Sequence, residues 1–249
     1  MMRTRSRHST TIGSAALAAA AALMLGGCSD DVVCPDGSAG LKPYVLASVV
    51  ETRGSWGART VGTAFCTADT LPAYLIVSVN DREFPPVGSG GAHGLSAALE
   101  EDILLWPPGT LCSLEVATDF GLADATAAVP GACEVAAPDS VAVGEDLVLS
   151  WTAADSADYY EVRAALRAAS PGDSVLLFVA TEDTTVTFGA ADITMAGTVV
   201  GRVFAVAGPF PDGGNGGNVT GAAWGFFTVA FSDTTGEFVL RVTDAPRSP

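Results

Sequence analysis

The sequence contains few basic residues and almost no histidine. Its 249 residues include 12 Lys and Arg and 2 His against 28 Asp and Glu, which gives a formal net charge of −16. Lys42 is the only lysine. Nucleic acids and anionic lipid headgroups both require positive charge on a protein that binds them. The composition therefore argues against nucleic acid as a partner.

Residues that catalytic and metal sites need are also scarce. His93 is the only histidine after residue 8, no C-x-x-C spacing occurs, and the strings G-x-S-x-G, H-E-x-x-H and G-x-x-x-x-G-K-[ST] are absent. A serine or cysteine nucleophile needs a nearby base, and structural zinc needs a set of Cys or His ligands. We therefore expect no catalytic residue, no metal and no cofactor, and predict that the protein is not an enzyme.

The cysteines are the exception to this scarcity. Cys28 directly follows the N-terminal segment 1–27, which is described below as a leader. The remaining four cysteines are Cys34, Cys66, Cys112 and Cys133. An even number of cysteines in an exported chain indicates two disulfides, and four cysteines allow three pairings. The strand order expected below favours Cys34–Cys66 and Cys112–Cys133.

The N-terminus has the parts of a secretory signal peptide. Arg3, Arg5 and Arg7 precede an apolar run over residues 12–25, and no acidic residue occurs before Asp30. A membrane-spanning helix needs roughly 20 apolar residues, so this run is too short to be a permanent anchor. We expect residues 1–27 to be removed.

The end of this leader, Leu25-Gly26-Gly27-Cys28, resembles the lipobox of bacterial lipoproteins. The resemblance implies a diacylglycerol on the Cys28 thiol and often palmitate on its amine. Each buried methylene of such chains contributes about 0.8 kcal/mol, so two or three chains hold a protein stably on a bilayer. The chain is thus expected in a bacterial cell envelope, and Ser29 favours the outer membrane.

Short β-rich runs separated by turn residues follow, which indicates an all-β protein built from sandwiches. Residues 28–42 are polar and glycine-rich and are expected to form a lipidated tether. An immunoglobulin-like sandwich is expected over 43–132. Its expected strands are 43–51, 59–68, 73–79, 94–106, 110–118 and 122–129. The front of 94–106 also fits a helical turn, and Asn80-Asp81 favours a tight hairpin.

A second sandwich is expected over 133–243, followed by a disordered tail over 244–249. Leu147, Leu149 and Trp151 alternate, and Tyr160 and Val162 alternate after a loop. Together with the later "GTVVGRVFAV", this order resembles a fibronectin type III domain over about residues 138–230. The resemblance implies that Trp151 and Tyr160 lie in the core. Residues 236–242 then fall beyond the last expected strand and are expected to add an edge strand.

Loops at the ends of sandwiches often bind partners. The candidates here are Trp56 in a glycine-flanked turn, and Asp212, Asn215 and Asn218 in the segment "FPDGGNGGNVTG". We interpret the chain as a lipid-anchored, non-catalytic binding or scaffolding module. Its expected partners are the membrane, through the anchor, and another envelope protein or a glycan. Two alternatives stay open: an accessory glycan-binding protein that uses loop aromatics, and a purely structural spacer.

Overall fold

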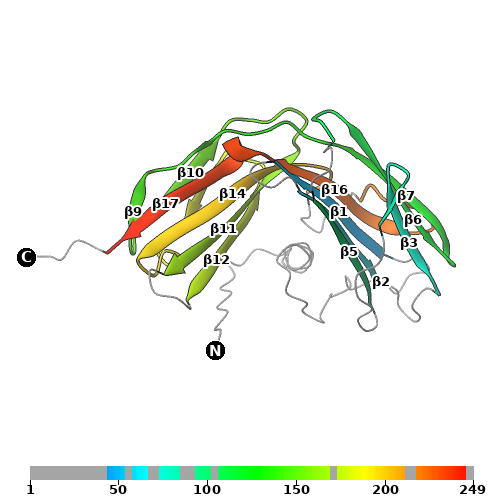
Figure 1. The fold of residues 1–249 in the computed structure, drawn as a ribbon, viewed down its shortest axis with the longest axis horizontal. Coiled ribbons are helices and arrows are strands. Elements are labelled where there is room, and N and C mark those ends of the chain that lie inside the picture. Colours follow the sequence, from blue (N-terminus) through cyan, green and yellow to red (C-terminus); the bar gives the residue numbers. More distant parts are fainter. Residues whose placement is uncertain are drawn as a thin grey trace, which may run out of the picture. The chain divides into compact units, whose positions relative to one another are not determined.

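Strands make up nearly all the regular structure in the described part of this chain (Figure 1). The computed structural model describes residues 44–53, 58–66, 73–84, 93–101, 106–168, 173–210 and 217–244. Within these ranges the only other regular element is a 3₁₀ turn, Thr234–Gly236. The expected all-β class is confirmed. No helix in the described part of the chain is long and apolar enough to cross a membrane.

The described chain divides into two units. Among the described residues, unit 1 consists of Gly131–Val206 together with residues 231–244, and unit 2 consists of residues 44–130 together with Ala207–Ala230. The chain therefore passes from one unit to the other three times. The sequence predicts a single boundary at residue 132, whereas the late segment Ala207–Ala230 belongs to the same unit as the chain before Gly131.

Unit 2 contains two sheets. One has the order β16-β1-β2-β5, formed by β16 (Trp224–Ser232), β1 (Tyr44–Thr52), β2 (Ala58–Cys66) and β5 (His93–Glu101). The last two residues of β16 belong to unit 1. The other sheet has the order β15-β7-β6-β3-β4, formed by β15 (Thr220–Gly221), β7 (Gly121–Ala128), β6 (Leu111–Thr118), β3 (Leu75–Val79) and β4 (Arg82–Phe84).

Alternation explains why unit 2 forms strands where the sequence predicts them. Along β6, Cys112, Leu114 and Val116 are buried while the residues between them are exposed, as a strand with one face on the core requires. Asn80 and Asp81 have φ values of 51° and 61°, which confirms the predicted tight hairpin between β3 and β4. The ambiguous front of 94–106 lies in β5 and is a strand.

Unit 1 is a sandwich of a three-stranded and a four-stranded sheet. The first has the order β13-β10-β8, from β13 (Thr185–Phe188), β10 (Leu147–Trp151) and β8 (Val135–Ala136). The second has the order β12-β11-β14-β17, from β12 (Ser174–Thr181), β11 (Tyr159–Ala168), β14 (Gly197–Ala207) and β17 (Glu237–Thr243). A short strand, β9 (Ser140–Ala142), pairs with β17 in parallel. This strand arrangement is that of an immunoglobulin-like sandwich.

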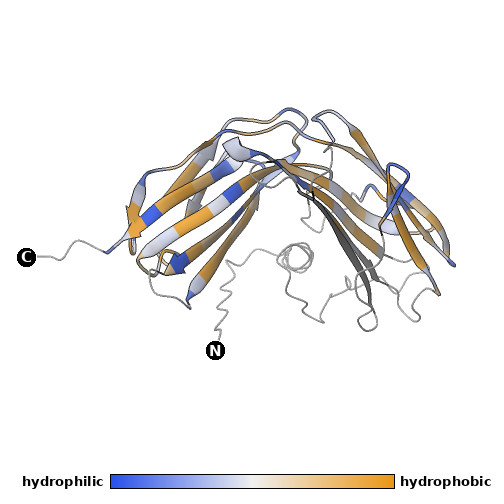
Figure 2. Ribbon diagram, viewed as in Figure 1, coloured by the Kyte–Doolittle hydropathy of each residue, from blue (hydrophilic) through white to orange (hydrophobic). Residues whose placement is uncertain are grey.

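Strand β17 is part of this sandwich and not an addition to it. It pairs with β14 from Gly197↔Val242 to Arg202↔Glu237. Its alternate residues Phe238, Leu240 and Val242 are buried in the core, and the hydropathy colouring of Figure 2 shows both apolar and polar residues along the strand. The end of the region that resembles a fibronectin type III domain, about residues 138–230, falls in β16, which lies mainly in unit 2.

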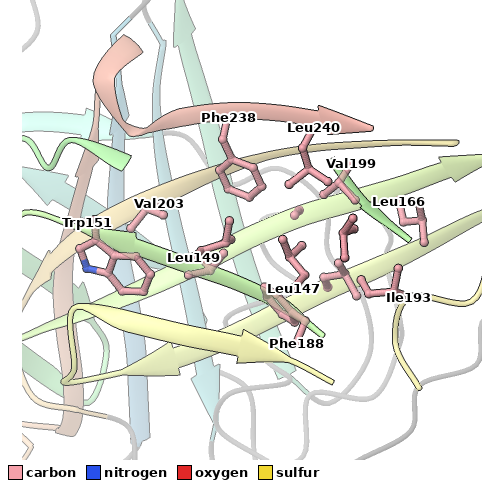
Figure 3. Packing of buried hydrophobic residues seen from close by; sticks show 14 of the residues in the cluster. Leu147, Leu149, Trp151, Leu166, Phe188, Ile193, Val199, Val203, Phe238 and Leu240 are labelled. Atoms are coloured by element: carbon pink, nitrogen blue, oxygen red, sulfur yellow. The ribbon is translucent and has the colours of Figure 1, made fainter. Parts of the chain in front are cut away.

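The core of unit 1 contains the residues that the fibronectin type III resemblance implied (Figure 3). Trp151 and Tyr160 are both buried, and their ring centroids lie 5.5 Å apart at an interplanar angle of 60°. Such tilted aromatic pairs add about 0.5–1.5 kcal/mol beyond the burial of their area. Gly201 makes room for Phe238, because a Cβ at Gly201 would lie 2.4 Å from Cζ of that ring.

Candidate functional site

Several residues singled out in the sequence lie outside the described part of the chain. These are Cys28, Cys34, Trp56, Asp212 and Asn215. The backbone of Cys66 ends β2, but its side chain is not described either, so the expected Cys34–Cys66 bridge stays a prediction.

Asn218 is described, and its side chain completes the structure of unit 2. Its Nδ2 donates to the carbonyl oxygen of Phe227 at 2.9 Å, and its Oδ1 accepts from the Phe227 N–H at 2.8 Å. Nδ2 also lies 3.4 Å from the carbonyl oxygen of Thr126 on β7. The amide thus holds the segment before β15 against both β16 and β7. The side-chain amide of Asn218 is therefore used by hydrogen bonds within unit 2. Its role in the structure is to support the fold.

Cys112 and Cys133 are both buried free thiols, so the expected bridge between them is not formed. Cys112 faces inward on β6 in unit 2. Cys133 belongs to the core of unit 1, where its Sγ lies 3.8 Å from the carbonyl oxygen of Val203. The expectation rested on an even cysteine count. Burial raises the pKa of Cys112 to about 12 and that of Cys133 to about 11, so both thiols stay protonated near neutral pH.

The most unusual polar group of unit 2 is a buried ion pair. Glu51 on β1 lies directly opposite Arg59 on β2, and Arg59 Nε donates to Glu51 Oε1 at 2.6 Å. The two residues are 0% and 1% exposed. The guanidinium also lies over the ring of Trp106, with 3.4 Å between Cζ and the ring centroid. This stacked geometry is the favourable one for a cation on an aromatic face.

Burial dominates the electrostatics of this pair. Desolvation raises the pKa of Glu51, and the hydrogen bond and charge of Arg59 offset only part of that rise. Both side chains are closed to solvent, so a substrate has no access to the carboxylate. In the described part of the chain, no three His, Cys, Asp or Glu side chains gather where they could hold a metal ion. The pair is best understood as part of the core of unit 2.

The exposed side of the four-stranded sheet in unit 1 has a different character. Four apolar residues form one row across its four strands, because the register pairs Leu176 with Ala165, Ala165 with Val200, and Val200 with Val239. Val239 is 68% exposed and Leu176 is 53% exposed. A row of apolar side chains that spans a sheet and faces water is typical of an interaction surface.

Arginines flank this apolar row on both sides. The next row on the same side of the sheet lies two residues further along each strand. It contains Arg167 and Arg241, which are both paired in register with Thr198. On the other side, Arg163 lies opposite Arg202. We call this surface the arginine face and define it by the following eight residues: Arg163, Ala165, Arg167, Leu176, Val200, Arg202, Val239 and Arg241.

The charge of the arginine face contrasts with the rest of the protein. Its four arginines are all the basic residues that the structure describes in unit 1, in a chain whose net charge is −16. Arg163 forms an ion pair with Glu161, and Arg202 forms one with Glu237. Arg163 also covers the ring of Phe204, with 4.4 Å from Cζ to the ring centroid.

The row of Arg167 and Arg241 differs from the row of Arg163 and Arg202. Arg167 and Arg241 are exposed, and neither takes part in an ion pair among the described residues. The arginine face therefore combines exposed apolar area with two solvent-exposed cations.

Sequence reasoning missed this surface. The outward positions of β11 read Glu161, Arg163, Ala165 and Arg167, so the alternation within one strand was visible. The gathering of arginines from β11, β14 and β17 depends on the register between strands, which single-strand patterns do not contain.

Comparisons with known proteins identify no family. No family model matches the chain, and no curated protein matches it. Among solved structures, the fn3 domain of the human collagen alpha-1(XX) chain is 17% identical, with 49% of this chain and 91% of that chain covered and a TM-score of 0.28. The FN1-FN3 domains of chicken CNTN1 are 14% identical, with 77% and 66% covered and a TM-score of 0.23. At these TM-scores the sandwich assignment rests on the strand order above.

Proposed function

We propose that the chain is a non-catalytic binding module of a bacterial cell envelope. It is held at the membrane through lipidated Cys28 and contacts an acidic partner through the arginine face. The lipobox-like end of the leader supports the anchor. The single observation that carries the binding role is the apolar row over Leu176, Ala165, Val200 and Val239, with Arg167 and Arg241 beside it.

The energetics suit a contact of modest affinity. A Leu or Val side chain contributes roughly 1.5–3 kcal/mol when it passes from full exposure to full burial. Leu176, Val200 and Val239 are only partly exposed before binding, so each contributes less than this. Association costs about 4–15 kcal/mol in lost translational and rotational freedom. The proposed anchor confines this chain to the membrane surface, which raises its effective concentration toward an envelope partner and offsets part of that cost. A small interaction surface can therefore be sufficient for binding when the chain is anchored to the membrane.

A photocrosslinking amino acid at Leu176 tests the role of the arginine face in cells. Val148 provides a matched control, because it is 52% exposed against 53% for Leu176 and lies on the outer side of the three-stranded sheet. We expect discrete crosslinked species from position 176 and none from position 148. Adding Arg167→Glu and Arg241→Glu should abolish them. Equal crosslinking from both positions, or adducts that survive the arginine changes, would contradict the proposal.

A further inference from the structure

We infer that the acidic partner of the arginine face is a second copy of this chain, which docks through the outer face of the β15-β7-β6-β3-β4 sheet in unit 2. This inference rests on the proposed function, since it names the occupant of the same surface. It is carried by a second surface on the chain that has the same layout as the arginine face and the opposite charge.

This second surface also begins with an apolar row. The register pairs Ile76 with Ala117 and Ala117 with Leu122 across β3, β6 and β7. Ile76 and Leu122 are exposed, and exposed Phe120 lies in the turn beside the row. Tyr74, also exposed, precedes Ile76 and donates its hydroxyl to the carbonyl oxygen of Thr118 at 2.9 Å.

An acidic row lies next to this apolar row. Two residues further along the strands, the register pairs Ser78 with Glu115 and Glu115 with Asp124. Both carboxylates are exposed, and neither takes part in an ion pair among the described residues. The Thr220 hydroxyl lies 3.3 Å from Asp124 Oδ2 and helps to fix that side chain. We call this surface the acidic face and define it by Ile76, Glu115, Ala117, Leu122 and Asp124.

The two faces match row by row. On each, a charged row follows an apolar row after two residues, a distance of about 6.8 Å along a strand. Across the strands the spacing differs, because Arg167 and Arg241 flank Thr198 whereas Glu115 and Asp124 are direct neighbours. The long arginine side chains of one copy therefore converge to meet the two carboxylates of another while the apolar rows pack together. Sheets stack at about 10 Å with their strands within about 30°, which is the geometry such a contact uses. Complementary charge also fixes the register of the two sheets.

Without Arg3, Arg5 and Arg7 of the leader, the chain keeps 9 basic and 28 acidic residues, and the resulting net charge of −19 does not prevent this contact at moderate salt. The Debye length is about 8 Å at 0.15 M ionic strength, so repulsion between distant charges of two copies is screened while close ion pairs persist. Because the two faces differ, the contact is heterologous, and each copy keeps one face available for a further copy. Anchored copies would then form rings or open chains on the membrane.

Sedimentation of the lipidated chain in detergent at about 0.15 M salt, across a concentration series, tests this inference. We expect concentration-dependent association. Arg241→Glu should weaken it at least about tenfold, since a close interfacial charge pair is typically worth that much. Val148→Glu/Ser150→Glu, which changes the net charge by the same two units on the outer side of the three-stranded sheet, should leave it unchanged.

Charge reversal of whole rows gives the decisive comparison. We expect the double variants Arg167→Glu/Arg241→Glu and Glu115→Arg/Asp124→Arg to be monomeric when measured separately. An equimolar mixture of the two should associate again, because each variant supplies the charge that the other has lost. Glu182→Arg/Asp183→Arg, at an exposed turn in unit 1, matches the second variant in charge and should behave like the parent.

The outcomes separate the two proposals. If the parent chain stays monomeric throughout the series, or if the mixture of reversed variants fails to associate, the second-copy inference is wrong. Crosslinking from Leu176 in cells would then still support the proposed function with a different acidic partner. If a reversed variant loses its parent-like thermal transition, the neutral variants Arg167→Gln/Arg241→Gln and Glu115→Gln/Asp124→Asn replace the pair, and each should still weaken association relative to the parent.

Discussion

Removing one partner of the buried Glu51–Arg59 pair should destabilise unit 2 far more than removing both. Glu51→Leu leaves the guanidinium buried without its counter-ion at a site that is 1% exposed. Breaking a buried pair in this way costs about 3–5 kcal/mol. Arginine does not lose its proton in proteins, so titration of Arg59 gives this variant no relief between pH 5 and pH 8.

The reverse change, Arg59→Met, should depend on pH. It leaves the Glu51 carboxylate buried, and burial already raises the pKa of that carboxylate. A protonated carboxyl is neutral, so the variant should lose less stability at pH 5 than at pH 8. The sign follows from linkage: a folded-state pKa above the unfolded value adds stability at low pH, and this stability is lost as the pH rises through the folded value.

The double variant Glu51→Leu/Arg59→Met completes the cycle. Replacing both charges with apolar side chains is often neutral or stabilising by about 1–4 kcal/mol. Loss of the cation stacked on Trp106 offsets up to about 2 kcal/mol of that gain. Urea unfolding of all four proteins gives the coupling free energy. Glu51→Leu costing less than about 1 kcal/mol, or additive single changes, would refute the buried-pair account.

Other perturbations test the remaining features. Cys112 and Cys133 should resist thiol reagents at pH 8 in the folded chain and both react after unfolding. Because burial raises the pKa of each thiol, the free energy of unfolding should fall as the pH rises above the ordinary thiol pKa. A disulfide-linked Cys112–Cys133 peptide in unreduced digests would contradict the assignment of both as free thiols. Asn218→Ala should lower the unfolding free energy by about 1–3 kcal/mol, measured in urea, through its lost hydrogen bonds to the backbone. A fragment of residues 43–130 should be unfolded by circular dichroism, whereas the same fragment joined to 207–230 by a flexible linker should fold. Cys28→Ala should abolish acyl mass on the chain and leave unprocessed precursor; an unmodified Cys28 in the parent would rule out the anchor.

Local chemistry made much of the fold predictable. Alternating Leu147, Leu149 and Trp151 identified a core strand, and Asn80-Asp81 identified a hairpin, because both signals act between near neighbours in sequence. The fate of residues 207–230 was not predictable in the same way. Their sequence indicates a strand, but a strand signal does not specify which sheet it joins, and here the chain returns to β1 and β7 of the earlier unit.

The candidate site was likewise predictable only where its signals are local in sequence. Arg163 and Arg167 of the arginine face lie in β11, where outward and inward positions can be read from sequence. In β14 and β17 apolar residues such as Val200 and Val239 also occupy outward positions, so the outward side of Arg202 and Arg241 is less evident from sequence. The face itself arises from the pairing of β11 with β14 and of β14 with β17. That pairing joins residues such as Arg167 and Arg241, which are distant in sequence and share no local signal. The predicted Cys112–Cys133 bridge was wrong for a related reason, since Cys112 lies in unit 2 and Cys133 lies in the core of unit 1.

Side-chain footprinting with hydroxyl radicals tests the central claim most directly. Leu176 and Val148 are 53% and 52% exposed, so they should be oxidised to a comparable extent relative to their intrinsic reactivities in the dilute, purified protein. If the arginine face is occupied in the envelope, oxidation of Leu176 should fall severalfold on intact cell membranes while that of Val148 is unchanged. Equal oxidation of Leu176 in both settings would mean that the arginine face stays open to water, which would contradict the proposed function.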